Sequence, residues 1–214
     1  MFGSRKWVVL VFMGLHLVGC ATTRIREPRV VTGRITDESG AVVVSSPVVV
    51  MGRSLDLVAH RMEYEERGRK EVRAVTDTQG QYRVEFVPAN LGNNFYLFFY
   101  DKTGFDRVKY RQPEPLDITS LLDRSRTVTV NQVLQMQQSW PEVQRQIAYY
   151  GANSDRGKIL RRHGLPEKRE AVSSGAEPAD VWWYYADGVG YWFSGEKLTR
   201  AQEFAPIRGA APTQ

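Results

Sequence analysis

Short stretches of alternating apolar and polar residues fill the chain from Val30 to about Gln135. Tyr82, Val84 and Phe86, for example, are separated by single charged residues, which is the pattern of a strand with one buried face. About seven such segments, divided by turn signals, predict a sandwich of short strands. The turns contain Asp and Gly, as in residues 37–40 and 77–80, because Asp can cap a turn and Gly can adopt positive φ.

Two segments of this region depart from simple alternation. Residues 94–100 (NFYLFFY) are apolar at every position but the first, so we expect a central strand that is covered on both faces. Residues 54–70 are charged and lack a clear period, so we expect a long loop there.

After Gln135 the pattern is first helical and then returns to strands. Ser139 is the N-cap candidate of a first helix and Asn153 or Ser154 that of a second, which Gly164 with Pro166 ends. Three strand candidates follow, at residues 181–185, 190–194 and 197–204. The predicted fold class is therefore β-rich α+β: an antiparallel β-sandwich over residues 29–135, a small ααβββ two-layer domain over residues 139–207, and a disordered tail at 208–214.

The N-terminal segment has the pattern of a signal peptide, assigned to residues 1–19. Arg5 and Lys6 precede an apolar run from Trp7 to Val18, which at about 12 residues is too short to span a membrane. The run ends at Cys20, the only cysteine of the chain. Residues 21–28 are polar, contain proline and follow no period, so we expect a tether there.

Residues 17–20 (Leu-Val-Gly-Cys) resemble the lipobox of bacterial lipoproteins. The resemblance implies cleavage after Gly19 and lipid attachment at Cys20, which would anchor the chain to a membrane. Ala21 is not acidic, and in the same families this implies sorting to the outer membrane, facing the periplasm.

The net charge argues against nucleic acid as a partner. The chain has a formal charge of +5, and the loss of Arg5 and Lys6 with the signal peptide would lower it to about +3. The basic residues are spread along the chain rather than clustered on one stretch. We therefore expect no nucleic-acid binding.

Two motifs in the β region resemble the carboxypeptidase regulatory-like, transthyretin-like sandwich family. They are V-x-G-x-I-x-D-x-x-G from Val31 to Gly40, and T-D-x-x-G-x-Y from Thr76 to Tyr82. The chain departs from that family at Ser46-Pro47 and in the longer insert at 54–70. The resemblance implies a non-catalytic unit that stabilises, adheres or presents a ligand.

The C-terminal region is similar to the small outer-membrane lipoprotein of the barrel-assembly machinery. The residues that carry this resemblance are S-x-x-x-x-I-L-x-x-x-G-x-P, from Ser154 to Pro166, followed by aromatic strands around residues 183–185. The resemblance implies two helices packed on a three-stranded antiparallel sheet. Membership of that machinery does not follow, because here the module lies C-terminal to a sandwich.

No constellation of residues predicts catalysis, a metal site or a cofactor. His163 lies at the expected end of a helix, where a polar or positive residue is favourable, and His60 lies in the charged segment. Glu63, Glu65 and Glu66 could form a cation or partner site, or simply a solvated stretch of mixed charge. No metal-ligand spacing and no nucleophile motif appears in the sequence.

Large aromatic residues in the last strands form the candidate interaction surface. Strand alternation places Trp182 and Tyr184 on one face and Trp183 and Tyr185 on the other. One face should pack on the two helices, and the other could pack on the sandwich, bind a partner protein, or stack on sugar rings. The candidate residues are Trp182, Trp183, Tyr184, Tyr185, Tyr191 and Trp192.

Together these patterns predict a function without catalysis. We expect an envelope lipoprotein that acts as a protein–protein interaction or assembly module at the membrane. The alternative is a lipoprotein that binds peptidoglycan or another polysaccharide.

Overall fold

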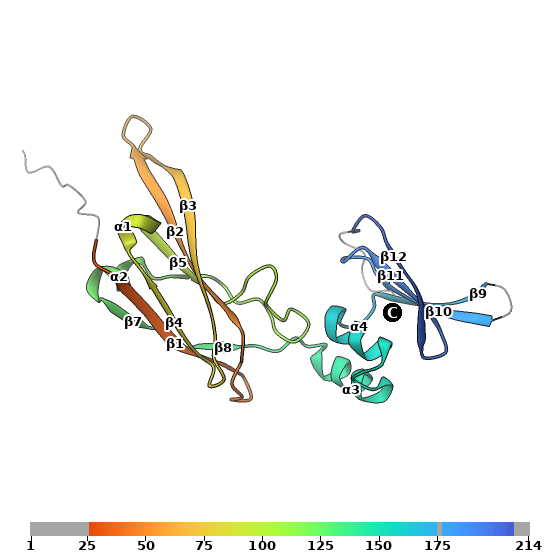
Figure 1. Ribbon diagram of the computed structural model, residues 1–214. Helices are drawn as coiled ribbons and strands as arrows, with labels where there is room; N and C mark the ends of the chain where they lie inside the picture. The colour runs from red at the N-terminus through yellow and green to blue at the C-terminus, as the bar shows by residue number, and fades with distance from the viewer. Residues whose placement is uncertain (1–25, 175–176, 208–214) are drawn as a thin grey trace, which may run out of the picture.

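The computed structural model describes residues 26–174 and 177–207 (Figure 1). The chain is β-rich, and its first part contains two four-stranded sheets, consistent with a β-sandwich. One sheet has the order β4-β1-β7, with β8 also paired to β1. Its strands are β1 (Arg29–Asp37), β4 (Gln81–Phe86), β7 (Thr127–Thr129) and β8 (Gln132–Leu134). The other sheet has the order β3-β2-β5-β6, from β2 (Pro47–Val58), β3 (Glu63–Val75), β5 (Asn94–Phe98) and β6 (Leu116–Asp117).

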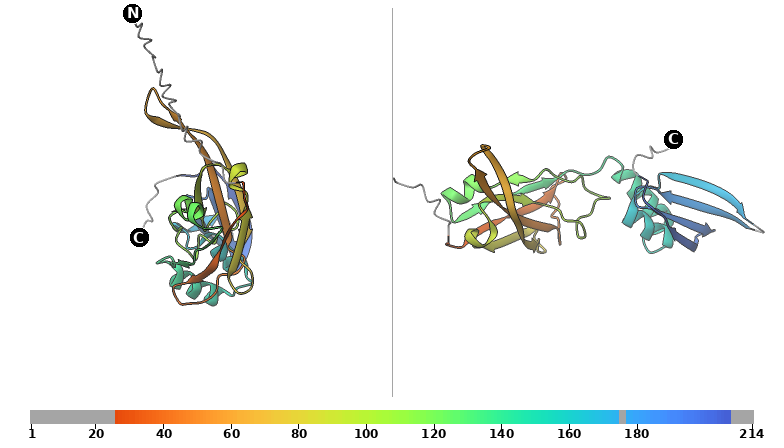
Figure 2. Two further views of the ribbon diagram at one scale, coloured as in Figure 1. Left: turned by 90° about the vertical axis from the view of Figure 1, so that its left-hand side faces the viewer. Right: turned by 90° about the horizontal axis from the view of Figure 1, so that it is seen from above.

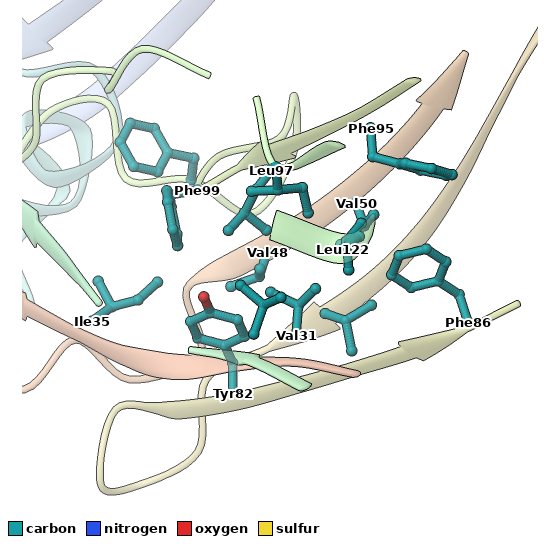
Figure 3. Close-up of a cluster of buried hydrophobic side chains, with 14 of the residues drawn as sticks. Val31, Ile35, Val48, Val50, Tyr82, Phe86, Phe95, Leu97, Phe99 and Leu122 are labelled. Carbon is teal, nitrogen blue, oxygen red and sulfur yellow. The ribbon is translucent and has the colours of Figure 1, made fainter. Parts of the chain in front are cut away.

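The inward faces of the two sheets share one hydrophobic core (Figure 3). Val31 and Ile35 of β1 face Val48 of β2 and Leu97 of β5, and all four are completely buried. Tyr82, the second residue of β4, lies in this core, as the alternation of Tyr82, Val84 and Phe86 predicts. Two short helices close the end of the sandwich, α1 (Pro88–Leu91) and α2 (Thr119–Arg124).

Both predicted turns are confirmed. Asp37 Oδ1 accepts hydrogen bonds from the backbone N–H groups of Ser39 and Ala41, and Gly40 has a φ of 83°. Asp77 Oδ1 caps the second turn in the same way, and a Cβ on Gly80 would lie 2.7 Å from the Ile35 carbonyl oxygen. Gly80 therefore meets two needs at once, a positive φ and a close approach of β1.

The sandwich is not purely antiparallel, and this part of the prediction is wrong. β1 pairs parallel with both β7 and β8. The chain leaves β6 at the edge of the second sheet and passes through α2 to the end of the sandwich where β1 begins. There the N–H of Val30 donates to the carbonyl of Arg126. β7 consequently starts beside the start of β1 and runs in the same direction.

The predicted loop at 54–70 is a long β-hairpin. β2 and β3 pair continuously from Pro47↔Val75 to Val58↔Glu63, with one register shift at Ser54/Leu55. Residues 61–70 are all exposed, so the sequence carries no alternation of buried and polar positions. Backbone pairing and cross-strand ion pairs hold this hairpin, among them Arg53–Glu66 at 2.6 Å.

The apolar segment 94–100 is covered on one face only, which corrects the expectation of a doubly covered strand. Phe95, Leu97 and Phe99 are buried in the core. Tyr96 and Phe98 point outward and are half-buried, because no helix or sheet of the described residues packs on the outer face of β5.

The C-terminal unit has two helices and four strands, one strand more than predicted. The sheet order is β12-β11-β10-β9, with every neighbouring pair antiparallel. Of the two predicted caps of the second helix, Ser154 and not Asn153 occupies the N-cap position, accepting a hydrogen bond from the Gly157 N–H at 3.0 Å. Ser139 occupies the N-cap position of the first helix without a side-chain hydrogen bond. The elements are α3 (Trp140–Tyr150), α4 (Asp155–His163), β9 (Lys168–Ser174), β10 (Glu177–Tyr184), β11 (Val189–Ser194) and β12 (Lys197–Glu203).

The predicted signal peptide, Cys20 and most of the tether lie outside the described residues. Within residues 26–174 and 177–207, no helix has the length and apolar character needed to cross a bilayer.

Candidate interaction surface

The two faces of the C-terminal sheet have different roles. One face packs on α3 and α4 around a core that contains Val143, Leu160 and Phe193. Trp182 and Tyr184 lie in this core and Trp183 and Tyr185 lie on the opposite face, so the predicted alternation is confirmed.

Three of the six predicted surface residues are therefore not on the surface. Trp182, Tyr184 and Tyr191 are buried because they face the helices, and Trp182 has no exposed area at all. Trp182 is further enclosed by two cations, since the guanidinium carbons of Arg156 and Arg169 lie 4.8 Å and 4.6 Å from its ring. These three residues belong to the folding core, and the candidate surface is reduced to Trp183, Tyr185 and Trp192.

Phe204 joins these three on the open face, and we call the four residues the aromatic patch. The rings of Trp183 and Tyr185 are parallel within 4°, with centroids 6.0 Å apart. Trp192 meets Trp183 edge to face at 5.2 Å, and Phe204 lies 5.9 Å from Trp183. All four side chains are partly exposed. Trp183 is the centre of the patch because it contacts each of the other rings.

A glycine lies beneath the patch. Gly190 is paired with Trp183 across β10 and β11, and a Cβ at this position would lie 2.8 Å from the Trp183 ring and 3.0 Å from the Trp192 ring. The missing side chain lets both indoles lie over the sheet backbone. This covering of a strand glycine by neighbouring aromatic rings also stabilises the sheet.

Charged side chains border the patch. The indole N–H of Trp183 donates to Glu170 Oε2 at 2.8 Å, and the Arg200 guanidinium lies 4.9 Å from the Trp192 centroid. Glu170 also pairs with Lys168. The hydrogen bonds from Lys168 and Trp183 lower the pKa of the Glu170 carboxyl. The patch thus has an aromatic centre and a charged rim.

The patch is directed away from the sandwich. Its described ring contacts and hydrogen bonds are all with residues of the C-terminal unit. Figures 1 and 2 show α3 and α4 between the sandwich and the C-terminal sheet, so the helices occupy the inner side. Packing on the sandwich therefore does not cover the aromatic patch.

Phe204 was absent from the predicted surface. It lies one residue beyond β12, where its N–H donates to the Gly188 carbonyl at 2.8 Å. The sequence places it at the end of a strand candidate, but only the pairing of β12 with β11 shows that it reaches Trp183 and Tyr185.

His163 occupies a structural position at the end of α4. Its Nδ1 lies 2.6 Å from Asp187 Oδ2, and its Nε2 lies 2.9 Å from the Tyr191 hydroxyl. Burial raises the pKa of Tyr191, which keeps the hydroxyl protonated. The histidine thus connects the helix end with β11 and the β10–β11 turn.

Asp101, Asp106 and Glu66 serve local structure. Asp101 accepts hydrogen bonds from the N–H groups of Thr103 and Gly104. Asp106 accepts hydrogen bonds from the N–H groups of Val108 and Lys109. Glu66 pairs with Arg53 and Arg69. Among the described residues, no three His, Cys, Asp or Glu side chains are grouped closely enough to hold a metal ion.

Comparisons with known proteins yield only distant structural neighbours. No family model matches the chain, and a search of curated proteins finds no significant match. The major plantain pollen allergen Pla l 1 matches with 12% identity over 51% of this chain and 93% of its own, at a TM-score of 0.30. A streptococcal ancillary pilin matches with 11% identity over 86% of this chain and 60% of its own, at a TM-score of 0.31. A hydroxyquinol 1,2-dioxygenase from Pseudomonas putida matches with 14% identity over 51% of this chain and 57% of its own, at a TM-score of 0.27.

Proposed function

We propose that this chain is a non-catalytic envelope lipoprotein, anchored through Cys20, whose C-terminal sheet binds a partner protein. The proposal includes two domains, the sandwich at 29–135 and the helix–sheet unit at 139–207, on a short tether. It also places the chain at the outer membrane, facing the periplasm. The lipobox-like residues 17–20 support the anchoring.

The observation that carries the partner-binding role is the aromatic patch. Four large rings remain partly exposed on a sheet face that no other described element covers. Trp, Tyr and Arg are the residues most enriched at the energetic centres of protein interfaces, and the patch with Arg200 combines all three. Contiguous exposed apolar surface of this kind marks interaction sites in soluble domains.

Site-specific photocrosslinking in cells tests this role. A photoreactive amino acid replaces Arg200 at the patch rim, and the matched control replaces Tyr149, which is 81% exposed on the opposite, helical side. We expect one discrete adduct with an envelope protein from position 200 and none from position 149. Trp183→Ala should abolish the adduct. Equal labelling from both positions, or an adduct that survives Trp183→Ala, would contradict the proposal.

Lipid attachment is tested separately. The protein purified from membranes should carry the mass of acyl chains on its N-terminal cysteine, and Cys20→Ser should remove both the added mass and the membrane association. An unmodified Cys20 would overturn the anchoring part of the proposal alone.

One geometric feature favours a second candidate, binding of peptidoglycan or another polysaccharide. The Trp183 and Tyr185 rings are parallel within 4°, and parallel ring faces suit stacking against sugar rings. The mature protein would then be retained on purified sacculi, and Trp183→Ala would release it. No retention on sacculi would eliminate this candidate.

A further inference from the structure

The β2–β3 hairpin extends beyond the sandwich as a free arm, defined here as residues 56–67 (Figure 1). The pairing of β2 with β5 ends at Arg53↔Asn94. The last hydrogen bonds from the hairpin to the sandwich join Leu55 to the Asn93 side chain, at 2.8 Å and 2.7 Å. Beyond that point β2 and β3 pair only with each other.

The arm is amphipathic. Leu57 and Tyr64 lie directly opposite each other on one face, and they are 52% and 72% exposed. Met62, in the turn at the tip, is 78% exposed. The other face carries the pair Asp56 and Glu65, and Arg67 lies 3.5 Å and 3.1 Å from these two carboxylates.

The arm leaves the sandwich at the same end where the chain enters it. β1 starts at Arg29, which is paired with Phe86 at the end of β4. The chain then passes through α1 to Asn94, which is paired with Arg53 at the base of the arm. Figure 2 shows the arm and the start of β1 at a common end of the molecule.

We propose that the tip of the arm inserts into the interface of the bilayer to which Cys20 is anchored. This inference rests on the proposed lipid attachment. Residues 20–28 span at most about 30 Å when fully extended, so the arm's end of the sandwich stays close to the membrane. From Arg53, the last β2 residue paired with β5, to Val58 the hairpin extends roughly 17 Å at the usual rise of a strand, so the tip of the arm lies within the reach of the tether.

The chemistry of the tip fits the interfacial region. Leucine and methionine bury their side chains among acyl chains, while tyrosine keeps its hydroxyl at the level of the headgroups. A two-stranded hairpin with water on both faces is only marginally stable. Contact with the bilayer would therefore stabilise the arm as well as orient the sandwich.

The net negative charge of the arm determines which lipid headgroups it can contact. Its carboxylates, on Asp56, Glu63, Glu65 and Glu66, outnumber the cations of Arg61 and Arg67. An anionic surface would repel this arm. The expected contact is therefore with zwitterionic lipid, and added anionic lipid should weaken it.

The test attaches residues 20–214 through the Cys20 thiol to a maleimide-bearing lipid in phosphatidylcholine vesicles. An environment-sensitive fluorescent amino acid replaces Met62, or in the control Thr78, which is exposed in the turn at the opposite end of the sandwich. We expect blue-shifted emission at position 62 and quenching by brominated lipid about twofold or more above that at position 78. The double variant Leu57→Ser, Tyr64→Ser should remove both signals.

Other outcomes overturn the inference in distinct ways. Equal emission and quenching at positions 62 and 78 would show that the arm does not touch the bilayer. A label at position 62 that is shielded in native envelopes but not on vesicles would assign the arm to a partner protein instead. Because the attachment to the vesicles is chemical, a failure of acylation in cells does not affect this result.

Discussion

Arg156 and Asp180 form an ion pair that joins α4 to β10, with 2.6 Å between Nη1 and Oδ2. The arginine side chain is 6% exposed, whereas that of the aspartate is 40% exposed. The guanidinium carbon lies 4.2 Å from the centroid of Phe193. Asp180 also accepts a hydrogen bond from the Trp182 indole at 3.0 Å. Asp180 is the nearer of two carboxylates beside this cation, since the exposed Glu196 Oε2 lies 3.8 Å from Arg156 Nε.

Removal of the Asp180 carboxylate should destabilise the fold more than removal of the Arg156 guanidinium. Asp180→Ala removes the hydrogen-bonded counter-ion of a buried guanidinium and leaves only the more distant, exposed Glu196, which should lower the free energy of unfolding by about 2–3 kcal/mol. Arg156→Met fills the space among the rings and leaves a half-exposed aspartate that water can hydrate, so we expect a loss of about 1 kcal/mol. Urea unfolding followed by tryptophan fluorescence measures both.

The exposed pair Arg83–Glu85, with 2.9 Å between the charged atoms, is the matched control. Arg83→Met should have almost no effect, because exposed ion pairs contribute little to stability. If Arg156→Met were as destabilising as Asp180→Ala, this account would be contradicted. The packing of the guanidinium on the aromatic rings would then stabilise the fold more than its neutralisation by Asp180 does.

The carboxyl of Asp37 should make stability depend on pH in the acid range. Burial opposes its ionisation, but hydrogen bonds from Ser39 and Ala41 and the Lys109 ammonium outweigh burial and lower the pKa of Asp37. Ionised Asp37 therefore stabilises the fold above the unfolded-state pKa of about 3.9. This contribution is lost as the pH falls through the lower, folded-state value.

Asp37→Asn removes this contribution. The free energy of unfolding of the variant should fall less steeply than that of the parent chain between about pH 5 and pH 2. Ser39→Ala, which deletes one of the hydrogen bonds, should give an intermediate slope. Urea titrations at a series of pH values measure the slopes, and identical slopes for the parent chain and Asp37→Asn would refute the assignment.

Tyr82 tests the structural role of the T-D-x-x-G-x-Y motif. Its hydroxyl donates to the Val130 carbonyl at 2.7 Å, and burial raises its pKa, so the hydroxyl stays protonated. Tyr82→Phe keeps the edge-to-face contact with Phe99 and deletes only the hydrogen bond. We expect a loss of about 1 kcal/mol in the free energy of unfolding. Tyr64→Phe on the exposed arm is the control and should unfold at the parent urea concentration.

Local signals predicted much of this fold. The Asp and Gly residues of the two turns and the alternation in β4 depend on nearest neighbours, and the structure agrees with them. The hairpin arm and β9 were missed because neither has a buried face in the sequence pattern. β9 starts Lys168-Arg169-Glu170, and β3 is exposed through residues 63–71. The parallel pairing of β1 depends on residues about a hundred positions away, which no local pattern encodes.

The candidate site was also predictable only as far as local patterns determine it. Alternation separated Trp183 and Tyr185 from their neighbours on β10, but it could not say which face the helices cover. That choice depends on how Leu160 and Val143 approach the sheet. Phe204 reaches the aromatic patch only through the pairing of β11 with β12.

Gly190 provides the most direct test of the geometry of the aromatic patch. A Cβ at this position would lie 2.8 Å from Cζ3 of Trp183 and 3.0 Å from Cζ3 of Trp192, so Gly190→Ala must displace both indoles. We expect a loss of about 1–3 kcal/mol in the free energy of unfolding and a changed near-ultraviolet circular dichroism spectrum. The photocrosslink from position 200 should weaken in the same variant.

Gly68→Ala is the matched control, since Gly68 lies in β3 and has no atom within 4 Å of an added Cβ. It should be neutral or slightly stabilising, because alanine restricts the unfolded chain more than glycine does. A folded Gly190→Ala chain with the parent spectrum and an unchanged crosslink would show that partner binding does not depend on indoles held over the glycine. If the spectrum changes but the crosslink stays intact, Gly190 matters only for the packing of the indoles. Partner binding would then depend on Tyr185, Phe204 or the charged rim.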